Sequence, residues 1–279
     1  MTKQRSLVIA AAAFLLISCG YVAVESEQPI SGDGYHQQQL TRLPFRVLLW
    51  NIHKENDNAL WQQEYLQLQQ QLQPDFILLQ ELVYKPQTTA NFTEKHQGFE
   101  YLANLYITES KSYSGVGSIA RVKPDYHRAH LTRAKEPITN SAKPTLITRY
   151  PITDSEHSLL LINLHGINFQ LSIDGYKQQL EVIADEVKQH TGAVIVAGDF
   201  NSWSEQRSDY LVTLMANMGL QAVDFGQQSS HIKSFLGQRL DHIYYSREWL
   251  AVKADSPRVI TGLQSSDHSP LYVTFEWRH

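Results

Sequence analysis

The run "AVIVAGDFNSW", residues 193–203, decides how this chain is interpreted. Its apolar part is short and rich in β-branched residues, as expected for a buried strand. Asp199 and Asn201 follow at the carboxyl end of that strand. Such a pair can form an Asx turn, or it can belong to a site at the edge of a sheet.

The same arrangement recurs along the chain, where short apolar runs predicted to be strands begin or end at polar residues. These residues are Asn51 after "RVLLW", Glu81 after "FILLQ", His165 in "SLLLINLHG", Asp241 at the start of "LDHIYYS", and Asp267 with His268 before "SPLYVTFEW". Amphipathic helices are predicted near residues 59–72, 176–187 and 211–218. This alternation predicts an α/β or α+β domain. Polar groups at strand ends can converge on one rim of a sheet.

Each polar residue also has a structural explanation. Asn51 can cap a helix, Glu81 can be a surface charge, and a lone His165 can be a hydrogen-bonded structural histidine. The functional interpretation is favoured because the structural explanation must hold independently at every position. Carboxylate and carboxamide oxygens without a thiol indicate Mg²⁺, Mn²⁺ or Ca²⁺ rather than zinc. Such a cation beside two histidines suits hydrolysis of a phosphate ester.

Length and charge limit the classes of function. The chain has 279 residues, of which 42% are hydrophobic, and this favours one large domain. Its 24 basic and 28 acidic side chains give a formal net charge of -4, so the whole molecule does not attract nucleic acid. A local cluster is either an anion-binding flank or a solvated face, and comprises Arg121, Lys123, His127, Arg128, His130, Arg133 and Lys135.

The N-terminus has the pattern of a secretory signal peptide over residues 1–19. Lys3 and Arg5 precede an apolar stretch that ends in "LISCG", and Cys19 is the only cysteine of the chain. The end of this segment resembles a bacterial lipobox, in which the cysteine becomes acylated. The alternative is an ordinary signal peptide with an incidental cysteine. Either reading predicts a domain that works outside the cytoplasm.

Two further segments complete the predicted organisation. Residues 20–43 are polar and lack periodicity, which predicts a tether. Residues 44–279 are predicted to form the catalytic domain. With an acylated Cys19, the protein would be anchored at the bacterial cell envelope.

Six motifs in order carry a family resemblance: "WNIHK", "LLQE", "NLHGINF", "AGDFNSW", "RLDHIYYS" and "SDHSPLYVTF". The region 46–277 resembles the endonuclease/exonuclease/phosphatase superfamily, which includes DNase I-like nucleases, abasic-site endonucleases, neutral sphingomyelinases and inositol polyphosphate 5-phosphatases. It is most similar to a bacterial subgroup. The resemblance implies a four-layer sandwich in which two mixed β-sheets pack face to face with helices outside.

The resemblance also implies roles at a metal site. Glu81 would be the main metal ligand, with Asn51 as a ligand or phosphate-site partner and Asp267 assisting. Asp199 and Asn201 would orient the attacking water and hold the phosphate, and Asp199 would share in general base action.

The remaining implied roles concern the histidines. His268, paired with Asp241, would contact the scissile phosphate or serve as base, because a carboxylate beside an imidazole raises its pKa. His165 would stabilise the leaving group or act as acid, and Glu136 in "KEP" is the candidate that orients it. Trp203 either lines the groove or is merely packed.

The predicted function is a divalent-metal-dependent phosphoesterase that hydrolyses a phosphodiester, with nuclease action as the first choice. Lipid or small-molecule phosphodiester cleavage is the second choice. The alternative of another class is a non-catalytic module that binds phosphate ligands or proteins at the envelope. The predicted partners are a phosphodiester substrate, in DNA, RNA or a lipid head group, and the membrane through the acyl anchor. No obligate protein partner is expected.

Overall fold

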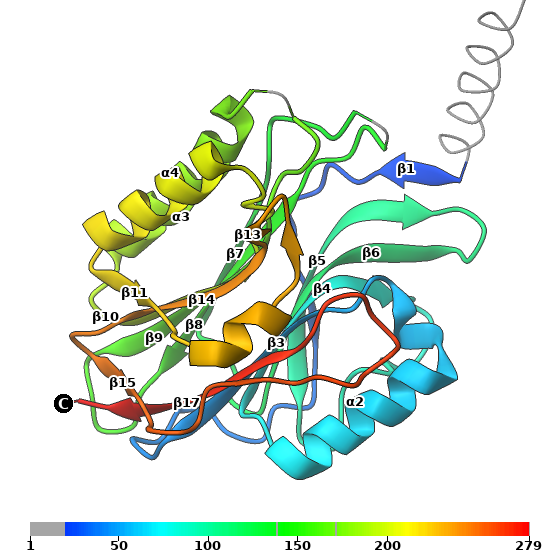
Figure 1. The fold of residues 1–279 in the computed structure, drawn as a ribbon. Helices are drawn as coiled ribbons and strands as arrows, with labels where there is room; N and C mark the ends of the chain where they lie inside the picture. Colours follow the sequence, from blue (N-terminus) through cyan, green and yellow to red (C-terminus); the bar gives the residue numbers. More distant parts are fainter. Residues whose placement is uncertain (1–19, 138, 171, 279) are drawn as a thin grey trace, which may run out of the picture.

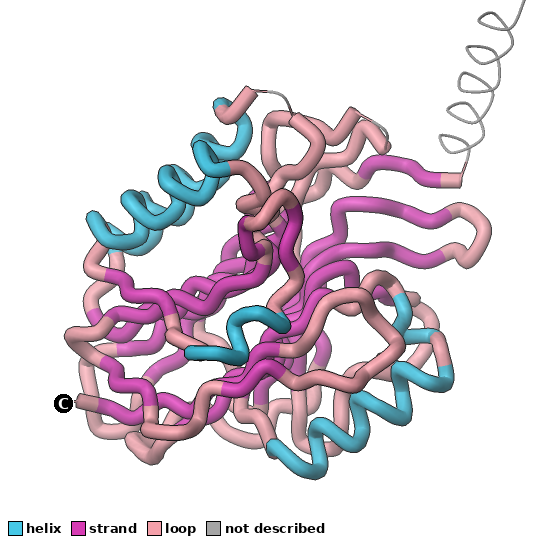
Figure 2. The backbone as a smooth tube through the Cα atoms, in the orientation of Figure 1, coloured by secondary structure: helices cyan, strands magenta, loops and turns pink. Residues whose placement is uncertain are grey.

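The computed structural model describes residues 20–137, 139–170 and 172–278. Two β-sheets pack face to face, and the long helices lie on the outer faces (Figure 1). Figure 2 shows the strands between α2 on one side and α3 with α4 on the other. The predicted four-layer sandwich is confirmed.

The first sheet runs in the order β1-β5-β6-β4-β3-β17-β15, with β2 paired to β5 and β16 to β17. Its strands are β1 (Tyr21–Ala23), β2 (Ile30–Gly32), β3 (Phe45–Asn51), β4 (Phe76–Tyr84), β5 (Gly98–Ile107), β6 (Ser112–Ala120), β15 (Leu250–Val252), β16 (Arg258–Val259) and β17 (Leu271–Trp277). The strands β3 and β4 are parallel, and the 3-10 helix η1 (Glu55–Asp57) and α2 (Ala59–Leu72) connect them.

The second sheet runs in the order β11-β14-β10-β9-β8-β7. Its strands are β7 (Tyr126–Leu131), β8 (Pro144–Pro151), β9 (Ser158–His165), β10 (Gly192–Asp199), β11 (Leu220–Ala222) and β14 (Asp241–Ser246). The strands β9 and β10 are parallel, and α3 (Asp174–Gln189) connects them. The remaining elements are α4 (Glu205–Asn217), the 3-10 helix η2 (Gly226–His231) and the hairpin of β12 (Ser234–Phe235) with β13 (Gln238–Arg239).

Apolar clusters hold the four layers together. Leu49 and Leu161 belong to the core between the sheets, whereas Trp61 packs α2 on the first sheet and Leu180 packs α3 on the second. Each fully buried side chain of this size contributes roughly 1.5–3 kcal/mol relative to exposure. Strands that are buried on both faces need apolar residues at successive positions. The apolar runs of the central strands are therefore continuous rather than alternating.

The predicted tether over residues 20–43 is wrong. The strands β1 and β2 both pair with β5, Gln37 bridges to Val122, and the buried Leu40 bridges to Ile152. The segment escaped sequence analysis because short edge strands are held by backbone hydrogen bonds, which require no apolar periodicity. The predicted signal peptide and Cys19 lie outside the described residues.

The middle of the chain supplies one wall of the site. The strands β5 and β6 form a long hairpin, and β7 follows at the edge of the second sheet.

Throughout the described part of the chain, no helix has the length and apolar character to cross a membrane.

Candidate functional site

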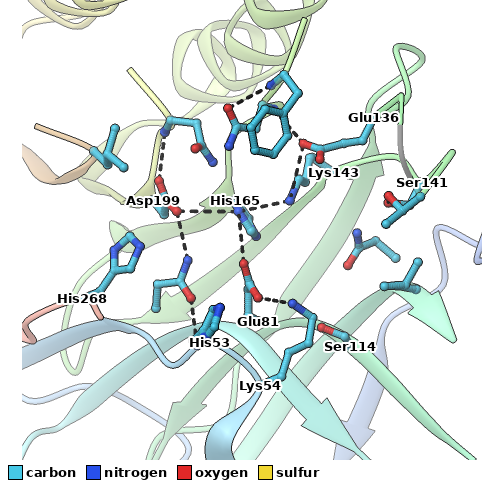
Figure 3. Close-up of a pocket in the computed structure, with 18 of the residues that line it drawn as sticks. His53, Lys54, Glu81, Ser114, Glu136, Ser141, Lys143, His165, Asp199 and His268 are labelled. Atoms are coloured by element: carbon cyan, nitrogen blue, oxygen red, sulfur yellow. Dashed lines mark hydrogen bonds and ion pairs between the residues drawn. The ribbon is translucent and has the colours of Figure 1, made fainter. Parts of the chain in front are cut away.

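A cleft of about 710 Å³ opens at the edge where the central strands of both sheets end. Both parallel pairs, β3 with β4 and β9 with β10, direct their carboxyl ends there, as expected for an α/β sheet. The predicted residues that line this cleft are Asn51, Glu81, Glu136, His165, Asp199, Asn201, Trp203, Asp267 and His268. Figure 3 shows the central ones directed toward one another from the two sheets.

Glu81 enters the cleft through an irregularity of β4. Gln80 pairs with Val116 and Leu82 with Gly115, so Glu81 is the extra residue of a bulge, with φ 53°. Its carboxylate forms an ion pair with Lys54, which follows β3. Burial alone would raise the pKa of Glu81, but Lys54, assisted by nearby cationic groups, holds that pKa well below its ordinary value. Glu81 is therefore ionised at neutral pH.

Asn51 and Asp199 join the two sheets across the cleft. Nδ2 of Asn51 donates to Oδ2 of Asp199 at 2.9 Å, and the backbone N–H of Asn201 donates to Oδ1. The Asx turn at Asp199 is thus present, and it is part of the site. Burial, followed by the charge of Asp241, raises the pKa of Asp199 to about 6.

Asn201 ties this turn to the end of β9. Its Nδ2 donates to the carbonyl oxygen of Gly166 at 3.0 Å, and the N–H of Gly166 donates to the carbonyl oxygen of Asp199. A Cβ on Gly166 would lie 2.2 Å from the carbonyl oxygen of Phe200, so only glycine permits this approach.

His268 is paired with Asp241, which opens β14 behind the cleft. Nδ1 of His268 lies 2.8 Å from Oδ2 of Asp241, and both residues are buried. Burial lowers the pKa of the imidazole, but Asp241, followed by Asp199 and Asp267, raises it to about 9. His268 is therefore protonated at neutral pH, which favours phosphate contact over the base role that sequence analysis left open.

His165 contacts Lys143 at the opposite side of the cleft. Lys143 Nζ lies 3.2 Å from Nε2 of His165. Because an ammonium group has only donors, this nitrogen of His165 accepts. Burial, followed by Lys143, lowers the pKa of His165 far below its ordinary value. The same Nε2 lies 3.6 Å from Oδ2 of Asp199. The contact with Lys143 favours stabilisation of the leaving group over the acid role for His165, and both roles stay predictions.

Glu136 meets Lys143 rather than the histidine that it was expected to orient. Its Oε1 lies 3.6 Å from Nζ of Lys143 and accepts from the N–H of Asn168 at 2.8 Å. Figure 3 shows Lys143 between Glu136 and His165. The orienting role is thus corrected to an indirect one through the lysine.

Asp267 and Trp203 lie nearer the mouth of the cleft. Asp267 Oδ2 lies 2.6 Å from Nζ of Lys233. Burial alone would raise the pKa of Asp267, but Lys233 and the neighbouring histidines lower it below its ordinary value. The Trp203 ring both lines the cleft and packs against the guanidinium of Arg207, 4.7 Å from the ring centroid. The two interpretations of Trp203 therefore both apply.

The donors at the cleft fit a hard divalent cation. Two carboxylates predicted to hold metal, Glu81 and Asp267, each pair with a lysine ammonium, which supplies the positive charge that a metal ion would supply. Their oxygens, and that of Asn51, are the ligand type that Mg²⁺ prefers. Among the described residues, Asp199, Asp241 and His268 form a separate group whose donor atoms lie within 4.8 Å of one another.

Three lysines of the cleft were not predicted from the sequence: Lys54, Lys143 and Lys233. Lys143 reaches the site because it precedes β8, which runs antiparallel to the strand that ends in His165. The predicted basic cluster does not contribute to the described lining of the cleft. Two of its members, Arg128 and Lys135, pair with Glu186 and Glu25, so the solvated-face interpretation is favoured.

Comparison with known proteins agrees with this architecture. Residues 48–268 match the model of the endonuclease/exonuclease/phosphatase family. The chain belongs to this family. Members of this family are phosphoesterases and nucleases, which supports hydrolysis of a phosphate ester at this site.

Individual relatives support the assignment at two levels. A UPF0294 protein of Yersinia enterocolitica is 34% identical over 231 residues, which are 83% of each chain. The human Nocturnin catalytic domain with bound sulfate has a TM-score of 0.61 at 15% identity, covering 90% of this chain and 97% of that one. TDP2 of D. rerio, solved with a single-strand DNA product, has a TM-score of 0.60 at 18% identity, covering 84% and 99%. These two structures establish likeness of fold.

Proposed function

We propose that this protein is a divalent-metal-dependent phosphodiesterase. The observation that carries the proposal is the convergence, in one cleft, of an ionised Glu81, the Asp199 carboxylate and the His268 imidazole, which Asp241 holds from behind the cleft. A phosphodiester needs charge neutralisation, an aimed water and support for the leaving oxygen. The cleft offers a group for each of these tasks.

Glu81 would hold the metal, with Asn51 and Asp267 as further oxygen donors. When bound, the cation supplies Lewis-acid stabilisation of the phosphate charge. The protonated His268 directs charge at a non-bridging phosphate oxygen, because Asp241 keeps its imidazole oriented and cationic. Asn201, which Gly166 and the turn at Asp199 hold in place, orients the attacking water relative to the phosphate.

Asp199 would accept the proton of the attacking water. Its pKa of about 6 leaves it ionised at neutral pH yet close enough to neutrality to take up a proton. The water oxygen bonds to phosphorus while the bond from phosphorus to the leaving oxygen breaks. Lys143, held by His165 and Glu136, donates a hydrogen bond to that leaving oxygen.

The test is turnover of bis-p-nitrophenyl phosphate by the purified protein with Mg²⁺, Mn²⁺ or EDTA. We expect metal-dependent release of nitrophenol that EDTA abolishes. Failure to hydrolyse this diester, plasmid DNA, oligonucleotides and sphingomyelin with any divalent metal would overturn the proposal. Turnover and ligand affinity of His268→Ala separate an enzyme from a non-catalytic binding module. An enzyme should lose turnover, whereas a binding module should tolerate this change far better.

The sequence placed nucleic acid first among the substrates, and this remains a prediction for the same assay. We also retain the proposal that the protein is an extracytoplasmic bacterial lipoprotein acylated at Cys19. Lipid labelling of the wild type, compared with Cys19→Ser, tests the anchor. A wild type that takes up no label would refute it.

A further inference from the structure

Three exposed apolar side chains surround the mouth of the cleft, and they are named here the apolar rim: Phe169, Phe235 and Leu236. Their exposed fractions are 60%, 56% and 71%. Phe169 lies on the loop after β9, whereas Phe235 ends β12 and Leu236 begins the turn that leads to β13. Phe169 and Phe235 line the cleft directly. Apolar surface gathered around a binding cleft indicates an interaction site.

Backbone conformation gives independent support to a function for the rim. Leu236 has φ 49° and Phe169 has φ 44°, in the left-handed region that Gly and Asn occupy more easily. Leu236 and Gly237 form a two-residue hairpin turn with positive φ at both positions, where Asn-Gly is favoured. The turn would be more stable with Asn at position 236, and the exposed Leu236 side chain does not pack in the core. Its presence therefore indicates that the side chain contacts something outside the protein.

The rim and the N-terminus of the described chain lie at the same end of the molecule. Thr108 N–H donates to the carbonyl oxygen of Gly20, and Tyr21 pairs with Ile107 of β5. Leu105 of the same strand lines the cleft, and the three residues from there to Thr108 span only ~10 Å. Figure 1 shows β1 beside the outer end of β5 and β6.

This placement matters because the expected tether is absent. Strand β1 begins at Tyr21, so an acyl chain on Cys19 would be joined to the folded domain almost directly. The β5–β6 hairpin, and with it the mouth of the cleft, would be held at the bilayer surface. The exposed Val22 of β1 lies at the same end.

We propose that the apolar rim docks on a lipid bilayer and that the substrate is the phosphodiester of a phospholipid head group. The inference rests on the proposed function, and it commits the cleft to one substrate class. Water adds to phosphorus, the bond to one bridging oxygen breaks, and that oxygen leaves as an alcohol after taking up the proton. The products are a phosphomonoester and an alcohol, and water is the sole co-reactant.

The charge distribution favours a lipid over a nucleic acid. Binding a nucleic acid strand requires cations that follow successive phosphates, whereas the basic cluster lies away from the described cleft lining and the chain carries a formal charge of -4. The three lysines Lys54, Lys143 and Lys233 all line this one cleft, which suits the binding of a single phosphate.

The first experiment compares two substrates with the full-length protein. Vesicles of phosphatidylethanolamine and phosphatidylcholine present the lipid, and bis-p-nitrophenyl phosphate is the soluble diester. Leu236→Asn removes the rim side chain, keeps a residue suited to positive φ, and leaves the cleft lining intact. We expect at least ~5-fold slower vesicle turnover with soluble turnover changed less than ~2-fold, because lost apolar insertion weakens docking alone.

The matched control is Leu66→Gln, which removes an exposed leucine from α2, outside the cleft. It should leave both activities unchanged. If the wild type hydrolyses the soluble diester but not the vesicle lipid, or hydrolyses DNA faster than the lipid, the inference is wrong while the proposed function stands. If no soluble diester is hydrolysed, the proposed function itself has failed.

The second experiment reads docking without catalysis. Leu236→Cys is labelled with a nitrobenzoxadiazole fluorophore, beside the same label on Leu66→Cys and on the wild type, which reports any reaction at Cys19. Every variant carries the same N-terminal segment, so differences between them report the rim. We expect a blue shift and quenching by brominated lipid at position 236 only. An aqueous spectrum at position 236 on vesicles would overturn docking.

Discussion

Nδ1 of His268 lies 2.8 Å from Oδ2 of Asp241, and this contact gives the stability of the protein a defined pH dependence. The pKa of His268 rises from 6.5 to about 9 on folding. The stabilisation is therefore fully present below pH 6.5 and is lost as the pH rises through about 9. We expect a loss of about 3 kcal/mol of unfolding free energy across this window in the metal-free protein.

Urea unfolding in EDTA at several pH values measures this loss. Asp241→Asn should be less stable at low pH and should show a much flatter profile between the two pKa values. Asp209→Asn, an exposed position on α4, is the control and should follow the wild type. Equal slopes in the wild type and Asp241→Asn would show that the pair does not store this energy.

The second prediction concerns Glu81→Gln. The amide retains the size of the side chain but loses the charge that pairs with Lys54 and would hold the metal. We expect kcat/KM for a soluble diester to fall by at least ~100-fold, because one charged group of a metal site is removed. Calorimetry should show weaker Mn²⁺ binding. Glu109→Gln, an exposed residue outside the cleft, serves as control; unaltered Mn²⁺ affinity in Glu81→Gln would exclude Glu81 as the main ligand.

The third prediction concerns Lys143→Met. Removing this ammonium should raise the pKa of His165 toward its ordinary value, because Lys143 is the largest charge that lowers it. Loss of a donor to the leaving oxygen should lower kcat by ~100-fold with a smaller change in KM. NMR titration of the imidazole and steady-state kinetics measure the two effects.

Lys143→Arg is the conservative variant, since it keeps the cation and should recover part of kcat. Lys123→Met removes a lysine of the basic cluster and should leave both quantities unchanged. A His165 pKa that stays unchanged in Lys143→Met would contradict the assigned contact.

The sequence predicts the fold and much of the site for one physical reason. Strands buried on both faces produce continuous apolar runs, and the residue that ends each run, such as Asn51 or His165, is visible as the first polar one. Parallel pairing then brings those ends to one edge. The family resemblance, and with it the four-layer architecture, is confirmed.

Other features depend on contacts that leave no pattern. The strands β1 and β2 have three residues each and are stabilised by hydrogen bonds to β5, so they are too short to show a strand pattern in the sequence. The bulge that turns Glu81 into the cleft depends on the register with β6. Lys143 acquires its role only because β8 lies antiparallel to β9, and that pairing is a long-range contact.

The last prediction concerns Asn163, which lies two residues before His165 in β9 and links the two sheets. Its Oδ1 accepts from Nε2 of Gln80 at 2.7 Å, and its Nδ2 donates to the carbonyl oxygens of Leu79 and Gly117. Asn163→Ala leaves the buried Gln80 amide without this partner, which should cost ~1–3 kcal/mol of unfolding free energy. Because Gln80 adjoins Glu81, Mn²⁺ affinity should fall as well.

Denaturant unfolding of Asn163→Ala and calorimetric Mn²⁺ titration of the still-folded variant test both parts. Asn217→Ala, at the exposed end of α4, is the control and should change unfolding free energy by less than ~0.5 kcal/mol. A variant as stable as the wild type would mean that water replaces the lost amide between the sheets. A destabilised variant with full Mn²⁺ affinity would show that the link supports the fold without positioning Glu81.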